Sequence, residues 1–215
     1  MLDEAAALLG DKAERDLNIL AEWKIVEGFR PLRKSMRSLA LSLYLAELIG
    51  ELFEVMDPHP PIYDRFRHAL TQLGTPGCEE SALAMLLDLL RAAGYLPSLT
   101  RCASCGQPTA GERMLYFSGA RGGVICRNCE AVVPDRVSID ARLVGIVVNI
   151  LRLPRENGAA VRLPRLTRAQ TDPLHEALAD HIEHVIQKRL RLKRHVVARR
   201  AAAARQTVSM KSPGQ

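Results

Sequence analysis

The spacing of apolar positions predicts a chain that is mostly helical. Apolar residues recur every three to four positions over residues 32–56, and Pro58 begins the proline cluster that ends this pattern. A second helix is predicted over residues 61–73. Residues 79–93 are apolar on nearly every side, which is typical of a helix at the centre of a core. Gly94 is expected to follow this helix as its C′ residue.

The remaining segments show other patterns. Residues 16–29 alternate partly and contain β-branched side chains, so one or two strands are expected there. A helix is predicted over residues 138–151, and residues 154–167 have the proline and glycine content of a loop. The last helix is expected to have Asp172 as its N-cap and Pro173 as its first residue, and to run to about residue 204.

Composition supports the mainly α fold class. Hydrophobic residues make up 47% of the 215 residues and aromatic residues only 4%, and the excess is Leu and Ala, which favour helices. The longest apolar runs stop well short of the roughly 20 residues that a membrane span needs. The N-terminus lacks the basic and apolar regions of a secretory signal. We therefore expect a cytoplasmic protein with no membrane partner.

Four of the five cysteines form two Cys-x-x-Cys pairs. Cys102 and Cys105 make the first pair, and Cys126 and Cys129 make the second after twenty intervening residues. This is the spacing of a zinc ribbon or knuckle, in which two turns present four thiolates to one tetrahedral ion, and Gly106 permits the first turn. The sequence therefore predicts a structural Zn²⁺ as cofactor, held by these four cysteines.

Two other cysteine chemistries compete with zinc. A redox dithiol would need a βαβ context that is absent, and an iron–sulfur cluster is less usual at this spacing. Four thiolate ligands leave no coordination position for water or substrate, so the ion is assigned a folding role. Residues 114–117 and 123–126 are expected to form a hairpin within this module, and Cys78 is interpreted as a small apolar residue.

Charge divides the chain into two unlike halves. Residues 1–100 hold 10 Lys and Arg against 15 Asp and Glu, a net charge of −5, whereas residues 101–215 hold 20 against 9, a net charge of +11. The basic half favours an anionic partner, although basic helix surfaces are also common solvated faces. Few aromatics are present to stack on bases, so contacts to phosphates are favoured. The candidate DNA-binding residues are Arg33, Lys34, Arg37, Lys188, Arg189, Arg191, Lys193 and Arg194.

The sequence shows no sign of an enzyme. None of the six histidines lies near a nucleophile or carboxylate constellation in the sequence, and there is no phosphate-binding glycine loop, Ser elbow or His-Glu-x-x-His motif. No catalytic residue is assigned.

The cysteine pairs and the helix before them resemble one known family. Residues 86–97, which read Leu-Leu-Asp-Leu-Leu-Arg-Ala-Ala-Gly-Tyr-Leu-Pro, are followed by Cys102-Ala-Ser-Cys-Gly, by Gly122-Gly123 and by Cys126-Arg-Asn-Cys. This order and spacing are similar to those of the RecO family of bacterial recombinational repair proteins. Residues 29–33 resemble the family's exit from its N-terminal domain, and the resemblance spans roughly residues 17–195.

The resemblance implies an N-terminal OB-fold joined to a helical domain that a zinc module interrupts. An OB-fold needs five strands, and only about thirty residues precede the first predicted helix, so a remnant of that fold is expected. The implied division is a strand remnant over residues 1–30, a helical domain over 31–99 and 136–205, the zinc module over 100–135, and a disordered tail over 206–215.

The resemblance also implies function and partners. Family members bind single- and double-stranded DNA, anneal strands, and work with RecR to load RecA onto DNA covered by single-stranded-DNA-binding protein, whose acidic tail is an expected partner. A bacterial, nucleoid-associated location follows. The leading hypothesis is a RecO-like mediator of repair and recombination. The alternatives are a zinc-stabilised adaptor for an acidic protein tail and a zinc-ribbon transcription or ribosome-associated factor.

Overall fold

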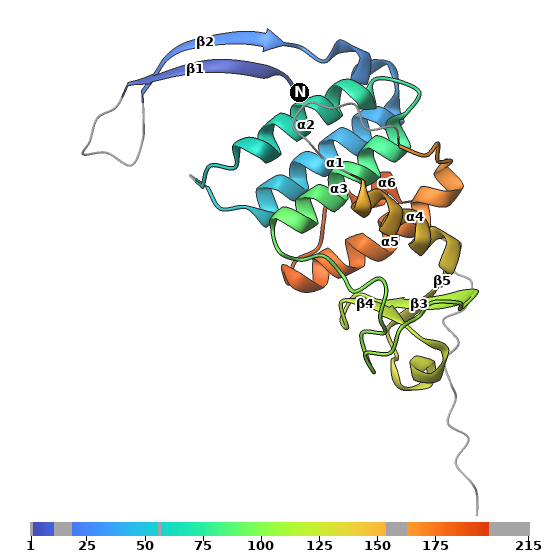
Figure 1. Cartoon of the computed structure of the whole chain (residues 1–215). Coiled ribbons are helices and arrows are strands. Elements are labelled where there is room, and N and C mark those ends of the chain that lie inside the picture. The colour runs from blue at the N-terminus through green and yellow to red at the C-terminus, as the bar shows by residue number, and fades with distance from the viewer. Residues whose placement is uncertain (1, 11–18, 56, 154–162, 198–215) are drawn as a thin grey trace, which may run out of the picture.

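The computed structural model describes residues 2–10, 19–55, 57–153 and 163–197, and it is mainly helical, as predicted (Figure 1). The helices are α1 (Met36–Leu52), α2 (Pro60–Leu73), α3 (Cys78–Ala92), α4 (Ala141–Arg152), α5 (Arg168–Val185) and the short α6 (Lys193–Val196). The strands are β1 (Glu4–Gly10), β2 (Ile19–Glu27), β3 (Met114–Ser118), β4 (Gly123–Ile125) and β5 (Arg136–Asp140). Among the described residues, no helix combines the length and apolar character that crossing a bilayer requires.

Helix α3 forms the centre of the core, as its apolar sequence predicted. Eleven of its fifteen residues are buried, including Leu83, Leu86 and Leu90, and α1, α2, α4 and α5 all contact it. Each fully buried leucine contributes about 1.5–3 kcal/mol. The helix ends in a Schellman arrangement: Gly94 has a φ of +78°, and the Tyr95 N–H donates to the Leu90 carbonyl at 2.8 Å. The prediction for Gly94 is therefore confirmed.

The first predicted helix begins later than expected. A 3₁₀ turn, η1 (Arg30–Lys34), precedes α1, because Ser35 adopts an extended conformation that interrupts the helical backbone. The Ser35 hydroxyl then accepts from the Ser38 N–H at 3.2 Å and caps α1. Helix α2 agrees with its prediction to within one residue at its start.

The start of the last helix differs from its prediction. Helix α5 begins at Arg168, because Thr167 and Gln170 form a capping box one turn earlier than the expected cap. The Asp172 carboxylate therefore does not cap this helix. It accepts from Arg37 at 3.0 Å and from Arg168 at 3.2 Å instead.

The end of the last helix is also a correction. Helix α5 ends at Val185, and Gln187 has a φ of +54°, so the helix does not continue toward residue 204. Carboxylates satisfy the next backbone donors: Glu183 accepts from the Leu190 N–H, and Glu47 accepts from the N–H groups of Arg191 and Leu192. Residues 198–204 of the predicted helix and the predicted tail over residues 206–215 lie outside the described residues.

The cysteine-rich segment contains a small antiparallel sheet in the order β4-β3-β5. The predicted hairpin is confirmed as β3 and β4. Sequence reasoning missed β5, which occupies the first residues of the helix predicted over 138–151. Helix α4 begins only at Ala141, where the Asp140 carboxylate accepts from the Arg142 N–H at 2.8 Å. Residues 154–162 of the predicted loop lie outside the described residues, and residues 163–167 form no helix or strand.

Strands β1 and β2 form a two-stranded antiparallel ribbon that projects from the helices (Figure 1). The strand predicted within residues 16–29 is confirmed over β2, whereas β1 was missed because its run of alanines carries little strand signal. Polar contacts fix the base of the ribbon to the helical body. Asp3 pairs with Arg33 at 2.8 Å, and Tyr63 donates to Glu4 at 2.9 Å.

A cluster of polar side chains joins three helices inside the bundle. Arg37 of α1 donates to both carboxylate oxygens of Glu79 on α3, at 2.7 and 2.8 Å, and to Asp172 of α5 at 3.0 Å. Thr171 also donates to Glu79, at 2.6 Å. Burial alone would raise the pKa of Glu79, but the bonds from Arg37 and Thr171 lower it. We call these four residues the Arg37 cluster.

Replacing Arg37 is expected to destabilise the protein strongly. An Arg37→Ala variant leaves the nearly buried Glu79 carboxylate without its cation, although Asp172 keeps Arg168, and the loss costs about 3 kcal/mol of unfolding free energy. The matched control is Arg33→Ala, which breaks a half-exposed ion pair and costs about 0–1 kcal/mol. Urea denaturation followed by circular dichroism measures both. Equal losses in the two variants would contradict the role of the Arg37 cluster.

A buried histidine makes stability depend on pH. Burial, followed by the nearby charge of Arg37, lowers the pKa of His175 from 6.5 to about 4. The unfolded chain therefore binds the proton first, so stability is full above pH 6.5 and falls toward pH 4, by about 3 kcal/mol. Denaturation at a series of pH values should show this loss in the wild type, with a smaller slope in a His175→Phe variant. An identical slope in both proteins would exclude His175 as its source.

Candidate metal centre and basic surface

The four sulfur atoms of Cys102, Cys105, Cys126 and Cys129 lie within 4.8 Å of one another. The Sγ atoms of Cys105 and Cys126 are 3.8 Å apart. A tetrahedral ion bound to thiolates at about 2.3 Å separates its sulfurs by about 3.8 Å. The arrangement and the donor atoms therefore fit a tetrahedral metal ion, and the structure brings together all four residues that the spacing predicted.

Two tight turns present these sulfurs. In the first, the Gly106 N–H donates to the Cys102 carbonyl at 2.8 Å, and Gly106 has a φ of +74°, which glycine adopts without strain. In the second, Cys126 follows β4, and the Cys129 N–H donates to the Cys126 carbonyl at 3.1 Å. Each Cys-x-x-Cys pair thus folds back on itself through backbone bonds.

The surroundings of the cysteines shift the pKa values of their thiols in opposite directions. Burial alone would raise the pKa of Cys102, but backbone N–H groups of Cys126, Cys105 and Ser104 outweigh burial and lower it to about 6. Hydrogen bonds with Cys105 and then Cys126 raise the pKa of Cys129 to about 12. Four crowded thiols cannot all ionise alone, and a divalent cation removes this conflict.

The cysteine module has a very small core of its own. Ile125 and Val133 are fully buried beside Cys102 and Cys126. This cluster is too small to hold the two cysteine turns in place by its own apolar burial. A bound ion that ties the two turns together would supply the missing stability.

Glycines of the cysteine module allow it to pack closely against α5. A Cβ on Gly119 would lie 2.9 Å from the backbone carbonyl of Asp180, so only glycine allows this close approach. The next residue of α5, His181, is buried, and its ring nitrogens lie 2.9 Å from the Tyr95 carbonyl and 3.3 Å from the Gly119 carbonyl. In the sequence, Gly119 and Gly122 were the one signal of this contact with Asp180 and His181.

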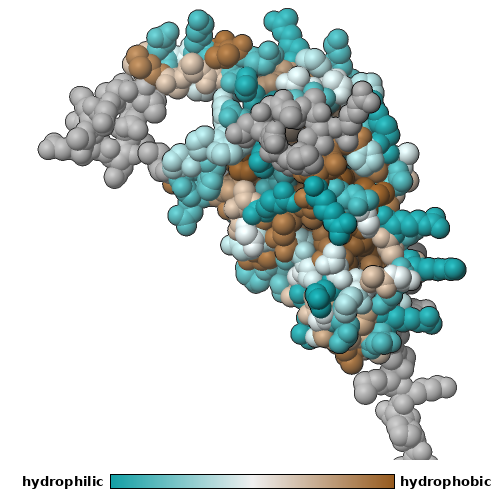
Figure 2. Space-filling view, in the orientation of Figure 1, coloured by the Kyte–Doolittle hydropathy of each residue, from teal (hydrophilic) through white to brown (hydrophobic). Residues whose placement is uncertain are grey.

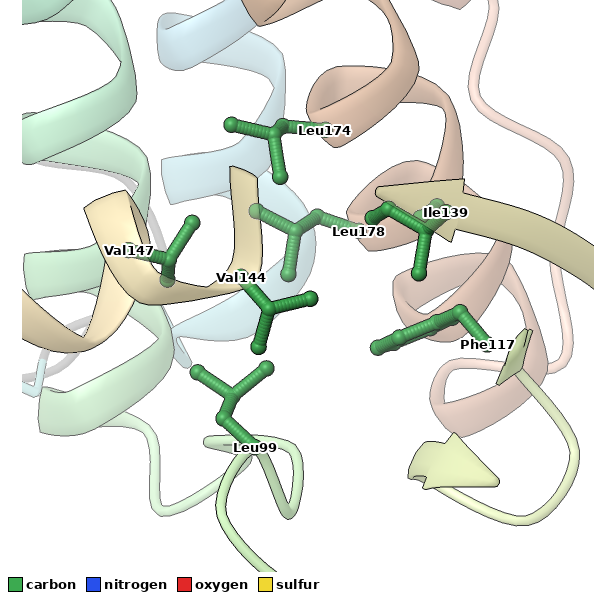
Figure 3. A pocket seen from close by; sticks show the side chains of 8 residues that line it. Leu99, Phe117, Ile139, Val144, Val147, Leu174 and Leu178 are labelled. Carbon is green, nitrogen blue, oxygen red and sulfur yellow. The ribbon is translucent and has the colours of Figure 1, made fainter. Parts of the chain in front are cut away.

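An apolar seam continues the contact between the module and the bundle. A small pocket there is lined entirely by apolar side chains from both parts (Figure 3). Phe117 and Ile139 come from the module, and they face Val144 of α4 and Leu178 of α5. The module is therefore packed against the helices through apolar side chains of both parts.

The structure separates the predicted basic residues into three groups. Arg37 lies within the Arg37 cluster, and the Lys193 ammonium pairs with Asp180 and, at 2.8 Å, with Glu183. Arg33 and Lys188 are about half exposed and pair with Asp3 and Glu51 respectively. The other four are exposed and form no ion pair with a described carboxylate; they are Lys34, Arg189, Arg191 and Arg194.

The segment after α5 runs back along α1. Lys188 contacts Glu51 near the end of α1, the Arg191 N–H contacts Glu47, and the Val196 carbonyl accepts from Arg37 near its start. Arg37 and Glu51 are separated by about 21 Å at 1.5 Å per residue. The two basic clusters, far apart in sequence, therefore meet along one helix. We call this set the cation row: Arg33, Lys34, Lys188, Arg189, Arg191 and Arg194.

The fold and the site define a class of mainly helical proteins with a small sheet that carries a four-cysteine cluster able to hold a metal ion. Residues 33–194 match the family model described as the C-terminal region of recombination protein O. The chain therefore belongs to the RecO family.

Relatives agree with this assignment. A DNA repair protein RecO of Anaeromyxobacter dehalogenans is 33% identical over 190 residues, which cover 88% of this chain and 73% of the relative. The RecO of Caldanaerobacter subterraneus is 25% identical over 165 residues, which cover 75% and 66%. The RecO of Rhodopirellula baltica is 32% identical over 131 residues, which cover 60% and 48%.

Proposed function

We propose that this chain acts in DNA repair and recombination by holding DNA through its phosphates, without catalysing a reaction. The observation that carries the proposal is the cation row, because four of its members, Lys34, Arg189, Arg191 and Arg194, are exposed and pair with no described carboxylate, and the segment with the last three contacts α1. Phosphate contacts of this kind position a nucleic acid without reading its sequence. Arg37 and Lys193 serve this surface indirectly by fixing α1 and the segment that carries the row.

The proposal includes the mediator activities of the family. Held strands would be annealed or passed to a recombinase of the RecA type, with a RecR-like partner and with single-stranded-DNA-binding protein present on the DNA. A second candidate function is an adaptor for an acidic protein tail. The same unpaired cations support this adaptor function, because Arg and Lys bind carboxylates as well as phosphates.

DNA binding should depend steeply on salt and on the cation row. Four phosphate contacts to a single strand would weaken affinity about 50-fold between about 50 and 200 mM salt. Charge reversal of Arg191 and Arg194 together should lower affinity and reduce the salt slope by about 1.4. Fluorescence anisotropy of a labelled oligonucleotide measures both.

The matched control reverses Arg113 and Arg142, which are exposed and adjacent at the start of β3 and α4. It makes the same change in net charge away from the cation row. Equal losses in the two double variants would point to net charge and remove the row from the site. Absence of DNA binding at the lower salt, together with salt-sensitive binding of an acidic peptide, would select the adaptor function.

We further propose that the metal is zinc and that its role is structural. One Zn²⁺ per chain is expected by elemental analysis. Chelation or a Cys105→Ser change should release it and open residues 100–135 to limited proteolysis, while the α-helical signal changes little. The control is Cys78→Ser, because Cys78 lies outside the four-sulfur cluster. An unchanged proteolytic pattern after verified metal removal would contradict the structural role.

A further inference from the structure

The β1–β2 ribbon exposes an unusual amount of apolar surface. Leu8, Leu20, Trp23, Ile25 and Val26 are each more than half exposed. Figure 2 shows hydrophobic atoms on the projecting ribbon, away from the helical core. A two-stranded ribbon that buries neither face is marginally stable in water. The exposed apolar side chains therefore indicate that the ribbon is covered by a partner and not by water.

The ribbon also has a free edge. In the described part of the chain, β2 pairs with β1 and with no other strand. Its second edge presents unpaired backbone N–H and C=O groups, which are a template for another strand. Pairing at this edge would satisfy those groups and cover the apolar side chains together.

The sequence of β2 is complementary to itself. Glu22 and Lys24 flank Trp23 symmetrically, and neither forms an ion pair with another described residue. In an antiparallel pair of β2 strands with a two-fold axis at Trp23, Glu22 lies opposite the partner's Lys24 and Lys24 lies opposite the partner's Glu22. Opposite charges at directly facing positions stabilise a strand pair, and like charges destabilise it.

The charges select one register among the neighbouring ones. With the axis at Trp23, the pairs of Glu22 and Lys24 lie within the regular part of β2, between the irregularities at Ala21 and Val26 in its register with β1. An axis at Glu22 would place two glutamates opposite each other, and an axis at Lys24 would place two lysines opposite each other. The alternation of charge about a single tryptophan thus specifies the register.

We propose that two copies of this chain associate through β2 to form a four-stranded sheet in the order β1-β2-β2-β1. The interface is isologous, as in most homodimers. Trp23 packs against the partner's Trp23 on the face that also carries Ile25 and, on β1, Ala5 and Ala7. This dimer goes beyond the proposed function and stands on the ribbon alone, whether or not the chain binds DNA.

The zinc-loaded full chain provides the first test. Sedimentation velocity over a range of protein concentrations should show a monomer–dimer equilibrium. Trp23 is the only tryptophan, so its fluorescence should shift to shorter wavelength over the same concentration range. A monomer at every concentration, or a dimer whose formation leaves the Trp23 spectrum unchanged, would overturn the proposal.

Charge exchange tests the register. Glu22→Lys and Lys24→Glu each create two like-charge contacts in the dimer, so each variant alone should dimerise at least about tenfold more weakly. An equimolar mixture of the two should restore association, because the lysines of the first variant would then face the glutamates of the second at both positions. The double variant, with both changes in one chain, should dimerise like the wild type.

The matched control is Asp64→Lys, which changes an exposed charge on α2 and should leave dimerisation unchanged. Circular dichroism and zinc content establish that every variant is folded. Single variants that dimerise as tightly as the wild type, or a mixture that stays monomeric, would overturn the proposal. Association that responds to changes elsewhere and not to these two residues would assign the interface to another surface.

Discussion

Glu79 lies in the first turn of a helix that is buried on nearly every side, so its carboxylate has to find partners inside the protein. Arg37 and Thr171 provide them from the helices on either side, and Asp172 completes the charge balance. These directional bonds fix α1 and α5 relative to α3, which apolar packing alone would not do, because hydrophobic burial has no preferred direction.

Helix α5 connects the Arg37 cluster to the cysteine module and to the basic segment that follows the helix. Its first turn is held by the Arg37 cluster, its middle receives the cysteine module at Asp180 and His181, and its last turns hold Lys193 through Asp180 and Glu183. The module and the chain that follows α5 are therefore seated on one rigid element. The position of the sulfur cluster relative to the cation row is consequently set by the bundle.

Much of this structure was predictable from local patterns, and the largest failure, at the end of the last helix, has a non-local cause. The apolar run of α3, its Gly94 terminus and the two cysteine pairs are signals contained within a few residues, and each was interpreted correctly. The last helix was extended too far because its basic residues look like a cationic helix end. Its true end depends on Glu47, a carboxylate more than 140 positions away that accepts the Arg191 and Leu192 N–H groups. Local periodicity carries no information about such partners.

The same distinction separates the basic residues by role. Sequence proximity grouped Arg37 with Arg33 and Lys34, yet Arg37 pairs with a carboxylate 42 positions away and lies nearly buried. A cation that is already neutralised gains little from a phosphate, because it would first have to leave its carboxylate in a poorly solvated place. Lys34, Arg189, Arg191 and Arg194 pair with no described carboxylate and would bear no such cost, so the proposed anion-binding surface depends mainly on the cations that the fold leaves unpaired.

The proposed annealing of DNA strands would add a geometric requirement that links the cation row to the ribbon. Two DNA strands repel each other, so a protein that joins them has to neutralise both at once. One row along one helix neutralises a single backbone. Arg33, at the start of the row, is paired with Asp3 at the base of the ribbon, so a dimer formed through β2 would carry two rows that begin at a common sheet. In such an assembly the apolar ribbon sets the distance between two phosphate-binding surfaces, and contact with DNA is left to the helices.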